Sequence, residues 1–459
     1  MLWLKMLRKE LKAYSPEQFT ELVVRLSDEY KPLISQARGA MASALSVNPD
    51  ALIPSRDEAE LYLRQSVSRA GEIFTDGQCL LIASVIDAAQ ALYYVQQDDG
   101  DESKDEKLSL QIALISSVKD AEAKLAQVQK ISEQVFGKGF SPYLYRSSEF
   151  ATLKSENAES AVALPTDDTY SAAAVLSNRD CRTLAIAVKA SGGLLERDIQ
   201  KQLSPEIREK APILVQELKD AKLVESEIVV ICSKTQAQVA RAPSREIIKE
   251  LAEKRVKCAC GRSLSEERAE EALSITNSGR ILLDKARWMS VLLVQELEAV
   301  GIPRDCIFLE ARVGGDEMDC VADVSGELVL FELKDKEFSL GNAYSFGAKI
   351  AIIKPNRPVI VTTEKVANDA KEHFVRAGLS GQVPDSMFSE SRSGIHYIEG
   401  IDSLRLGLEM LATTIFRNDA VNLLGRVLPL VSVDGAALFD AFESARTGAV
   451  ERKAEAERP

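Results

Sequence analysis

Three charged residues in the C-terminal half of the chain, Asp319, Glu332 and Lys334, stand where a buried strand is expected. The run Leu328–Phe331 is continuously apolar, which is typical of a central strand covered on both faces. Glu332 and Lys334 come directly after this run and share one face, because side chains alternate along a strand. Charge at the end of such a strand needs a balancing group, so the pair indicates chemistry.

A second strand, expected over 317–324, carries Glu317 and Asp319 on one face, and Ser325-Gly326 predicts a tight hairpin turn after it. The register decides whether Asp319 lies beside Glu332. In that case two or three carboxylates and one ammonium group meet at one edge of the sheet. Crowded carboxylates repel one another unless a cation lies between them, and oxygen ligands suit Mg²⁺ or Mn²⁺. The alternative is a surface hairpin with ordinary solvated charges.

The elements that must position these residues follow an α-β-β-β-α-β order. Apolar spacing and turn residues predict helices over 283–300, 340–350 and 364–377, and strands over 306–313, 317–324, 328–334 and 358–362.

Asp319, followed after twelve residues by Glu332-Leu333-Lys334, resembles the signature of the PD-(D/E)XK nuclease superfamily, which includes many restriction enzymes. The expected element order is similar to the core of that superfamily, although the Pro that usually precedes the Asp is replaced by Met318. The resemblance covers about residues 283–377, within a domain expected over 283–400. It implies a restriction-endonuclease-like fold and Mg²⁺- or Mn²⁺-dependent hydrolysis of phosphodiester bonds.

The same resemblance implies the roles of the residues. Asp319 and Glu332 would bind the metal, and Lys334 would orient or activate the attacking water. Glu317 would be an extra ligand or a residue that supports the ligands. Two polar residues of the following helix, Asn342 and Tyr344, would face the site, although Tyr344 also suits packing.

A compact unit over 179–245 is expected to hold three short helices and a hairpin, which resembles a winged helix-turn-helix domain. Its helices are predicted over 182–189, 194–202 and 205–222, and its strands over 227–232 and 237–240. The stretch 179–260 holds 16 Lys and Arg against 12 Asp and Glu. The third helix would therefore contact DNA through Arg208, Lys210 and Lys219. Winged helices also dock proteins, and this alternative stays open.

The connector over 246–282 contains Lys257-Cys258-Ala-Cys260-Gly261-Arg262, which looks like one knuckle of a zinc ribbon. Cys232 is available as a third thiolate. Tetrahedral zinc needs four ligands, usually from two closely spaced pairs. The sequence therefore leaves two interpretations, a structural Zn²⁺ site and a decayed ribbon with free thiols.

The N-terminal region over 1–150 is predicted to be helical. A helix begins after Ser15-Pro16-Glu17, and further helices are expected over 80–95 and 108–135, on either side of an acidic loop over 98–106. Residues 151–178, which are rich in Ala, Ser, Thr and Asp, are expected to form a linker. Residues 401–459 are expected to form C-terminal helices, one over 403–415, and a charged tail.

Composition narrows the function classes. The 459 residues include 57 Lys and Arg against 70 Asp and Glu, which does not favour coating of nucleic acid by bulk charge. Two histidines, His373 and His396, are too few for a multi-histidine metal centre. Seven thinly spread cysteines indicate reduced thiols in a cytoplasmic protein. The most apolar stretch, Cys79–Ile86, is too short to span a membrane.

The sequence therefore predicts a multi-domain α+β protein that acts as a metal-dependent nuclease, with DNA as the expected substrate. The setting would be defence against foreign DNA or DNA repair. The alternative is a non-catalytic DNA-binding or scaffold protein that acts through the winged helix and the N-terminal helices. Those N-terminal helices would bind a protein partner or a second copy of the chain.

Overall fold

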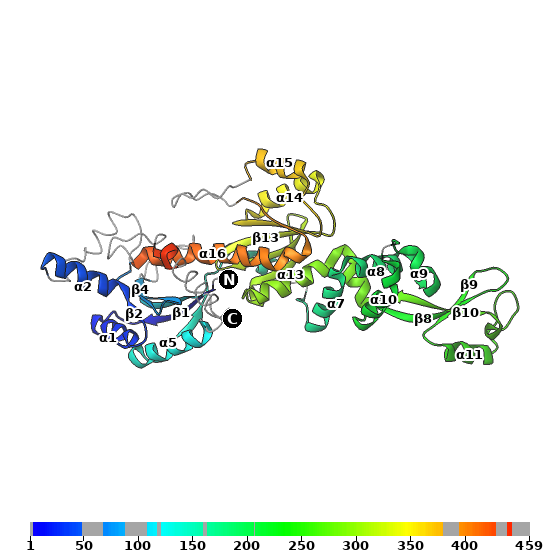
Figure 1. The fold of residues 1–459 in the computed structure, drawn as a ribbon, viewed down its shortest axis with the longest axis horizontal. Coiled ribbons are helices and arrows are strands. Elements are labelled where there is room, and N and C mark those ends of the chain that lie inside the picture. Colours follow the sequence, from blue (N-terminus) through cyan, green and yellow to red (C-terminus); the bar gives the residue numbers. More distant parts are fainter. Residues whose placement is uncertain are drawn as a thin grey trace, which may run out of the picture. The chain divides into compact units, whose positions relative to one another are not determined.

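The computed structural model describes residues 3–47, 68–87, 108–116, 121–158, 163–205, 207–379, 394–427 and 438–442. The protein is of mixed α and β structure with three sheets among these residues (Figure 1). It divides into two compact units. Unit 1 contains Met1–Glu156, Ala322–Val329 and Leu406–Pro459, and unit 2 contains Asn157–Val321 and Leu330–Arg405.

Unit 1 is built around a six-stranded sheet with the order β2-β3-β4-β5-β1-β6, whose neighbouring strands are all antiparallel. Its strands are β1 (Trp3–Leu11), β2 (Lys31–Pro32), β3 (Ala70–Thr75), β4 (Cys79–Asp87), β5 (Leu108–Ser116) and β6 (Ser141–Tyr143). Helices α1 (Pro16–Ser27) and α5 (Ala121–Phe136) share a core with the sheet, in which Leu22 and Val128 join Leu81 and Leu110. Helix α2 (Leu33–Leu45) follows β2.

The helical N-terminal region predicted from the sequence is wrong for most of its length. Helix α1 is confirmed, and the Ser15 side chain caps it. However, the stretches expected as helices over 80–95 and 108–135 begin as strands β4 and β5, and only α5 is helical in the second. Every residue of β5 is buried, so its sequence lacks the alternation that identifies a strand and has the appearance of a buried helix. Residues 88–95 and the acidic run 98–106 lie outside the described residues.

The stretch expected to be a linker contains helices α6 (Ser148–Glu156) and α7 (Asp167–Ser177), so the expectation of an irregular segment is wrong there. Thr166 and Thr169 form a reciprocal capping box at the start of α7. Alanine has the highest helix propensity of all residues, and Ala172 and Ala173 are buried in α7. The alanine-rich composition interpreted as a linker therefore belongs to a helix that packs through small side chains.

The three short helices and the hairpin expected over 179–245 are confirmed as elements. They are α8 (Arg179–Ser191), α9 (Glu196–Gln202), α10 (Ala211–Asp220), β8 (Val224–Ile231) and β9 (Gln238–Ala242), with β7 (Leu194–Leu195) before α9. Helix α10 begins later than predicted, because Arg208–Lys210 form a separate 3-10 turn. A strand that the sequence did not predict, β10 (Arg268–Ile275), lies between β7 and β8 in the order β7-β10-β8-β9. Helix α11 (Arg245–Glu253) follows β9.

The α-β-β-β-α-β order expected over 283–377 is also confirmed, with bounds shifted by a few residues. The elements are α13 (Arg287–Ala299), β11 (Ile307–Val313), β12 (Asp316–Val324), β13 (Glu327–Lys334), α14 (Leu340–Ile353), β14 (Arg357–Thr362) and α15 (Asn368–Arg376). The strands form a sheet of order β11-β12-β13-β14-β15, and β15 (His396–Glu399), which was not predicted, pairs parallel with β14. Ser325 and Gly326 have φ angles of 54° and 86°, as a two-residue type I′ hairpin turn requires.

Helix α16 (Leu404–Val427) is longer than the helix predicted over 403–415. Among the helices that the structure describes, none combines the length and the apolar character needed to cross a membrane. The charged tail over 446–459 lies outside the described residues.

Candidate functional site

Strand β13 brings a carboxylate into the interior of unit 2. Residues Leu328–Phe331 are at most 1% exposed, and Glu332 directly after them is only 2% exposed. The strand is the middle one of its five-stranded sheet. A carboxylate in such a place must be paired or hydrogen-bonded, because removing a charge from water is costly.

Strand β12 places Asp319 beside this carboxylate. The Oδ2 atom of Asp319 accepts a hydrogen bond from the backbone N–H of Leu333 at 2.7 Å. Burial and, after it, the negative charge of Glu332 raise the pKa of Asp319 to about 6. The Leu333 N–H and two nearby lysines act in the opposite direction. The register that the sequence left open therefore brings Asp319 and Glu332 together.

Two ammonium groups bind the two oxygens of Glu332. Lys334 Nζ lies 3.0 Å from Oε1, and Lys349 Nζ lies 2.7 Å from Oε2. Burial lowers the pKa of Lys334, but the charges of Glu332 and Asp319 outweigh it and leave that pKa above its usual value. We call Asp319, Glu332, Lys334 and Lys349 the carboxylate–lysine cluster.

The sequence did not lead us to Lys349, which lies on α14 and is 8% exposed. The available signal was a lone cation in the apolar run Ala348–Ile353. A buried lysine in such a helix needs a nearby carboxylate. Only the tertiary structure shows that Glu332 supplies it.

The secondary candidates are placed differently. Glu317 pairs with Lys285 through Oε2 at 2.9 Å. Asn342 accepts hydrogen bonds from the Ser339 N–H and hydroxyl in the capping box of α14. Tyr344 is 59% exposed and lies against His373, with 4.4 Å between ring centroids.

Helical geometry separates Asn342 from Tyr344. Asn342 precedes Lys349 by seven residues, so it lies on nearly the same face of α14, about two turns away. Tyr344 precedes Lys349 by five residues, which places it roughly 140° around the helix. Asn342 therefore lies on the face of α14 that carries Lys349, whereas Tyr344 lies on a different face.

The end of β13 is also fixed from outside the sheet. Asp335, the residue after Lys334, pairs with Arg182 of α8 at 3.1 Å and accepts a hydrogen bond from the Trp288 indole N–H at 3.3 Å. The Arg182 guanidinium lies 4.7 Å from the centroid of the Trp288 ring. Helices α8 and α13 therefore both anchor the strand end that carries the cluster.

The cluster fits a hard divalent cation in one respect and resists it in another. The negative charge of Glu332 raises the pKa of Asp319 on the neighbouring strand, which is the situation that an Mg²⁺ or Mn²⁺ ion relieves. Both oxygens of Glu332, however, already bind ammonium groups. A cation at Glu332 would have to displace at least one of them.

The residues expected to contact DNA lie on two short segments. Arg208 and Lys210 belong to the 3-10 turn, and Lys219 belongs to α10. Arg208 Nε donates to the Leu203 carbonyl at 3.2 Å. Lys210 lies 3.9 Å from Asp180, and Lys219 lies 3.9 Å from Glu196. Lys210 remains largely exposed, as contact with phosphate requires.

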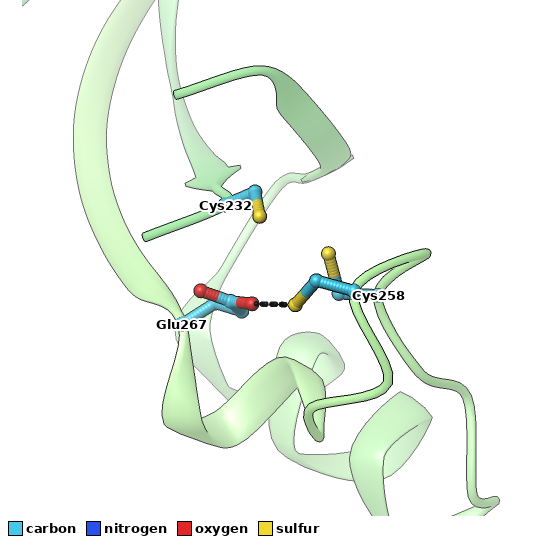
Figure 2. Close-up of side chains that lie close together, drawn as sticks. Cys232, Cys258 and Glu267 are labelled. Carbon is cyan, nitrogen blue, oxygen red and sulfur yellow. Dashed lines mark hydrogen bonds between the residues drawn. The ribbon is translucent and has the colours of Figure 1, made fainter. Parts of the chain in front are cut away.

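A second group of side chains meets beyond the end of β8. The structure brings together the three cysteines singled out from the sequence, Cys232, Cys258 and Cys260, and adds Glu267. Their sulfur atoms and one carboxylate oxygen all lie within 4.8 Å of one another, and Figure 2 shows Cys232, Cys258 and Glu267 pointing toward a common space. We call these four residues the cysteine cluster. No sequence pattern distinguishes Glu267, because carboxylates are scattered through the region.

Comparison with known proteins gives no family assignment. No family model matches the chain, and no curated protein matches it. Among solved structures, the protein VC1899 from Vibrio cholerae aligns at 12% identity and a TM-score of 0.28, over 61% of this chain and 64% of that one. A protein of unknown function, AF1548, aligns at 18% identity and a TM-score of 0.20, over 34% of this chain and 95% of that one.

A repair endonuclease from Pyrococcus abyssi also aligns, at 11% identity and a TM-score of 0.17, over 42% of this chain and 95% of that one. The chain thus spans less than two thirds of the Vibrio cholerae structure and nearly all of the two other chains. Likenesses at these TM-scores do not establish a function for this chain.

Proposed function

We propose that the protein is a metal-dependent nuclease of the restriction-endonuclease-like class, with the carboxylate–lysine cluster as its active site and DNA as its substrate. One observation carries the proposal. Glu332, at the end of an apolar central strand, is 2% exposed and lies beside the acid of the neighbouring strand. Two neighbouring carboxylates held away from water disfavour folding, and a role in chemistry explains their position.

The residues have separate tasks in this proposal. Asp319 and Glu332 would hold an Mg²⁺ or Mn²⁺ ion, which lowers the pKa of a bound water and neutralises charge on the scissile phosphate. Lys334, which is half-buried next to Glu332, would orient the attacking water and offset the charge that builds on the phosphate. Lys349 would hold the Glu332 side chain in place from the α14 side.

Delivery of DNA would fall to the helices before the site. Lys210 and Lys219 would bind phosphates, while Arg208 is partly engaged in holding the turn at Leu203. Arg182 links α8 of this unit to Asp335 next to the cluster. DNA bound by the 3-10 turn and α10 would therefore lie on the same group of helices as α8, which fixes the end of β13.

The test is cleavage of supercoiled and linear DNA by the full chain with Mg²⁺, Mn²⁺ or EDTA. We expect cleavage with either metal, none with EDTA, and loss of cleavage in Glu332→Gln and Lys334→Ala. The matched controls are Glu372→Gln and Lys365→Ala, which change exposed residues of the same unit. Cleavage that persists in both site variants would refute the assignment of these residues.

One observation favours the second candidate, a DNA-binding or scaffold protein without nuclease activity. The lysines that bind both Glu332 oxygens satisfy this carboxylate without any metal. In that case the cluster would be a buried ion-pair network that stabilises the sheet. Metal-independent retardation of DNA without cleavage would support this alternative.

A further inference from the structure

The cysteine cluster begins with a tight turn after β8. The Cys232 N–H donates to the Ala237 carbonyl at 2.9 Å, and the Gln236 N–H donates to the Cys232 carbonyl at 2.8 Å. These two bonds close the β8–β9 hairpin at Cys232. The Thr235 N–H donates to Cys232 Sγ at 3.4 Å, which holds this sulfur at the turn.

A second tight turn carries the other two cysteines. Lys257 and Ser263 form an antiparallel bridge, and within it the Cys258 N–H donates to the Arg262 carbonyl at 2.9 Å. Gly261 closes the turn through its N–H to the Cys258 carbonyl, at a φ of 94° that side chains rarely adopt. Two turns built in this way, facing each other, resemble the paired knuckles of a zinc ribbon.

Glu267 connects the two turns and takes the place of the second cysteine that the first turn lacks. It lies just before β10 and is 7% exposed. One carboxylate oxygen accepts the Ser233 N–H at 2.6 Å, and the other lies 3.0 Å from Cys260 Sγ. The carboxylate is thus held by the first turn and aimed at the thiols of the second.

From these contacts we infer that Cys232, Cys258, Cys260 and Glu267 form a closed, four-coordinate Zn²⁺ site. Thiolates select zinc over magnesium or calcium, and a site whose four ligands all come from the protein is structural. Tetrahedral zinc with Zn–S distances of about 2.3 Å sets its sulfurs about 3.8 Å apart. The four ligand atoms lie within 4.8 Å of one another, so they need to move only slightly closer together to bind zinc.

The surrounding packing gives an independent reason for a metal. In the part of the chain that the structure describes, the core that joins β8, β9 and α11 contains five buried residues, Ile228, Val230, Ala242, Ile248 and Leu264, and five partly buried ones pack against them. A hydrophobic core of this size rarely holds a fold together without a disulfide or a metal. The cysteines of the cluster form no disulfide. Zinc would therefore fix the hairpin and the second turn to the start of β10.

The first test is the metal content of the purified full-length protein after dialysis, measured by elemental mass spectrometry. We expect about one zinc per chain, lost in Cys258→Ser/Cys260→Ser and retained in the control Cys306→Ser, which changes a buried cysteine outside the cluster. A chain free of zinc, or equal zinc in the double variant and the control, would overturn the site. A Cys232–Cys258 disulfide in place of the metal would also overturn it.

Cobalt tests the ligand set in the unaltered fold. Protein stripped of zinc and titrated with Co²⁺ should show sulfur-to-cobalt charge-transfer bands together with the intense visible bands of tetrahedral cobalt. Glu267→Gln should lower Zn²⁺ affinity roughly tenfold or more, and Glu267→Cys should strengthen the charge-transfer bands. Spectra of six-coordinate cobalt, or a Glu267→Gln variant that binds zinc like the parent, would exclude Glu267 as a ligand. Neither readout depends on nuclease activity.

Discussion

The two clusters of unit 2 differ in the atoms they offer and in what balances their charge. The carboxylate–lysine cluster offers oxygens, and its ammonium groups already neutralise Glu332. The cysteine cluster offers three sulfurs and one carboxylate, and Glu267 is held by a backbone N–H and a thiol. In the carboxylate–lysine cluster a divalent cation can replace a lysine at Glu332, which suits a catalytic site. The cysteine cluster supplies all four ligands of a tetrahedral zinc ion, which suits a permanent structural site.

The largest expected effect is on DNA cleavage, which should depend on the carboxylate–lysine cluster and not on zinc content. Glu332→Ala should lower DNA cleavage at least about a thousandfold, because a lost metal ligand removes several kcal/mol of transition-state stabilisation. DNA affinity should stay largely intact, and zinc content should not change. Cleavage rates, band shifts and elemental analysis on one preparation measure all three. Equal cleavage by variant and parent would remove the site, whereas loss of zinc would indicate general misfolding.

The next effect tests whether Lys349 is a counterion of Glu332. Lys349→Met should destabilise the metal-free protein by about 3 kcal/mol, because it leaves a buried carboxylate with only one cation. The exposed Lys365→Met is the control, and Glu332→Leu/Lys349→Met should recover most of the loss. Mn²⁺ should reduce the loss if a divalent cation can replace the lysine. Equal stability of the two single variants would show that the pair contributes nothing.

Fluorescence offers a local probe for this measurement. The chain has two tryptophans, Trp3 in unit 1 and Trp288 in unit 2. In a Trp3→Phe background, unfolding followed by fluorescence reports the unit that carries the cluster. Trp288 is also hydrogen-bonded to Asp335, next to Lys334. The signal therefore comes from the immediate neighbourhood of the site.

The third prediction concerns pH in the metal-free protein. Burial and Glu332 raise the pKa of Asp319 to about 6 from 3.8, so the folded state binds more protons than the unfolded state between these values. The contribution of Asp319 to stability is full below about pH 4 and is lost as the pH rises through 6. Asp319→Asn cannot ionise, and at pH 7 in EDTA it should be more stable than the parent by on the order of 2 kcal/mol.

Urea unfolding at pH 4, 5, 6 and 7 measures this difference. The gain from Asp319→Asn should shrink toward zero at pH 4, where both proteins carry an uncharged side chain. Asp316→Asn, an exposed acid on the same strand, is the control. Parallel stability curves for Asp319→Asn and the parent would show that Asp319 is not held beside a second charge.

The sequence sufficed for the fold around the carboxylate–lysine cluster and failed for the sheet of unit 1. Around the cluster, strands end at strong signals, such as the Gly314-Gly315 and Ser325-Gly326 turns, and helices alternate with strands. In unit 1, β4 and β5 are buried on both faces, so strand and helix patterns look alike. Their identity depends on pairing between residues far apart in the chain, such as Leu81 with Leu114.

The same distinction applies to the sites. Asp319, Glu332 and Lys334 could be selected because two strands joined by a short turn bring nearby residues together. Lys349 and Glu267 could not, because each reaches its cluster only through packing: one through α14 against β13, the other through the start of β10 against two turns. A sequence pattern identifies ligands joined by local geometry and misses those supplied by tertiary contacts.

The smallest expected effect concerns helices α8 to α10, which precede both clusters in the sequence. Lys219 lies 3.9 Å from Glu196, and such partly exposed pairs contribute little to folding, so Lys219→Ala should leave stability unchanged. If Lys219 binds a phosphate, the slope of log affinity against log salt should fall by about 1, equally for unrelated DNA sequences. Lys201→Ala, on α9 and paired with Asp198, is the control. An equal change of the salt slope in both variants would contradict the contact. It would mean that DNA binding depends on total positive charge and does not depend on contact with α10.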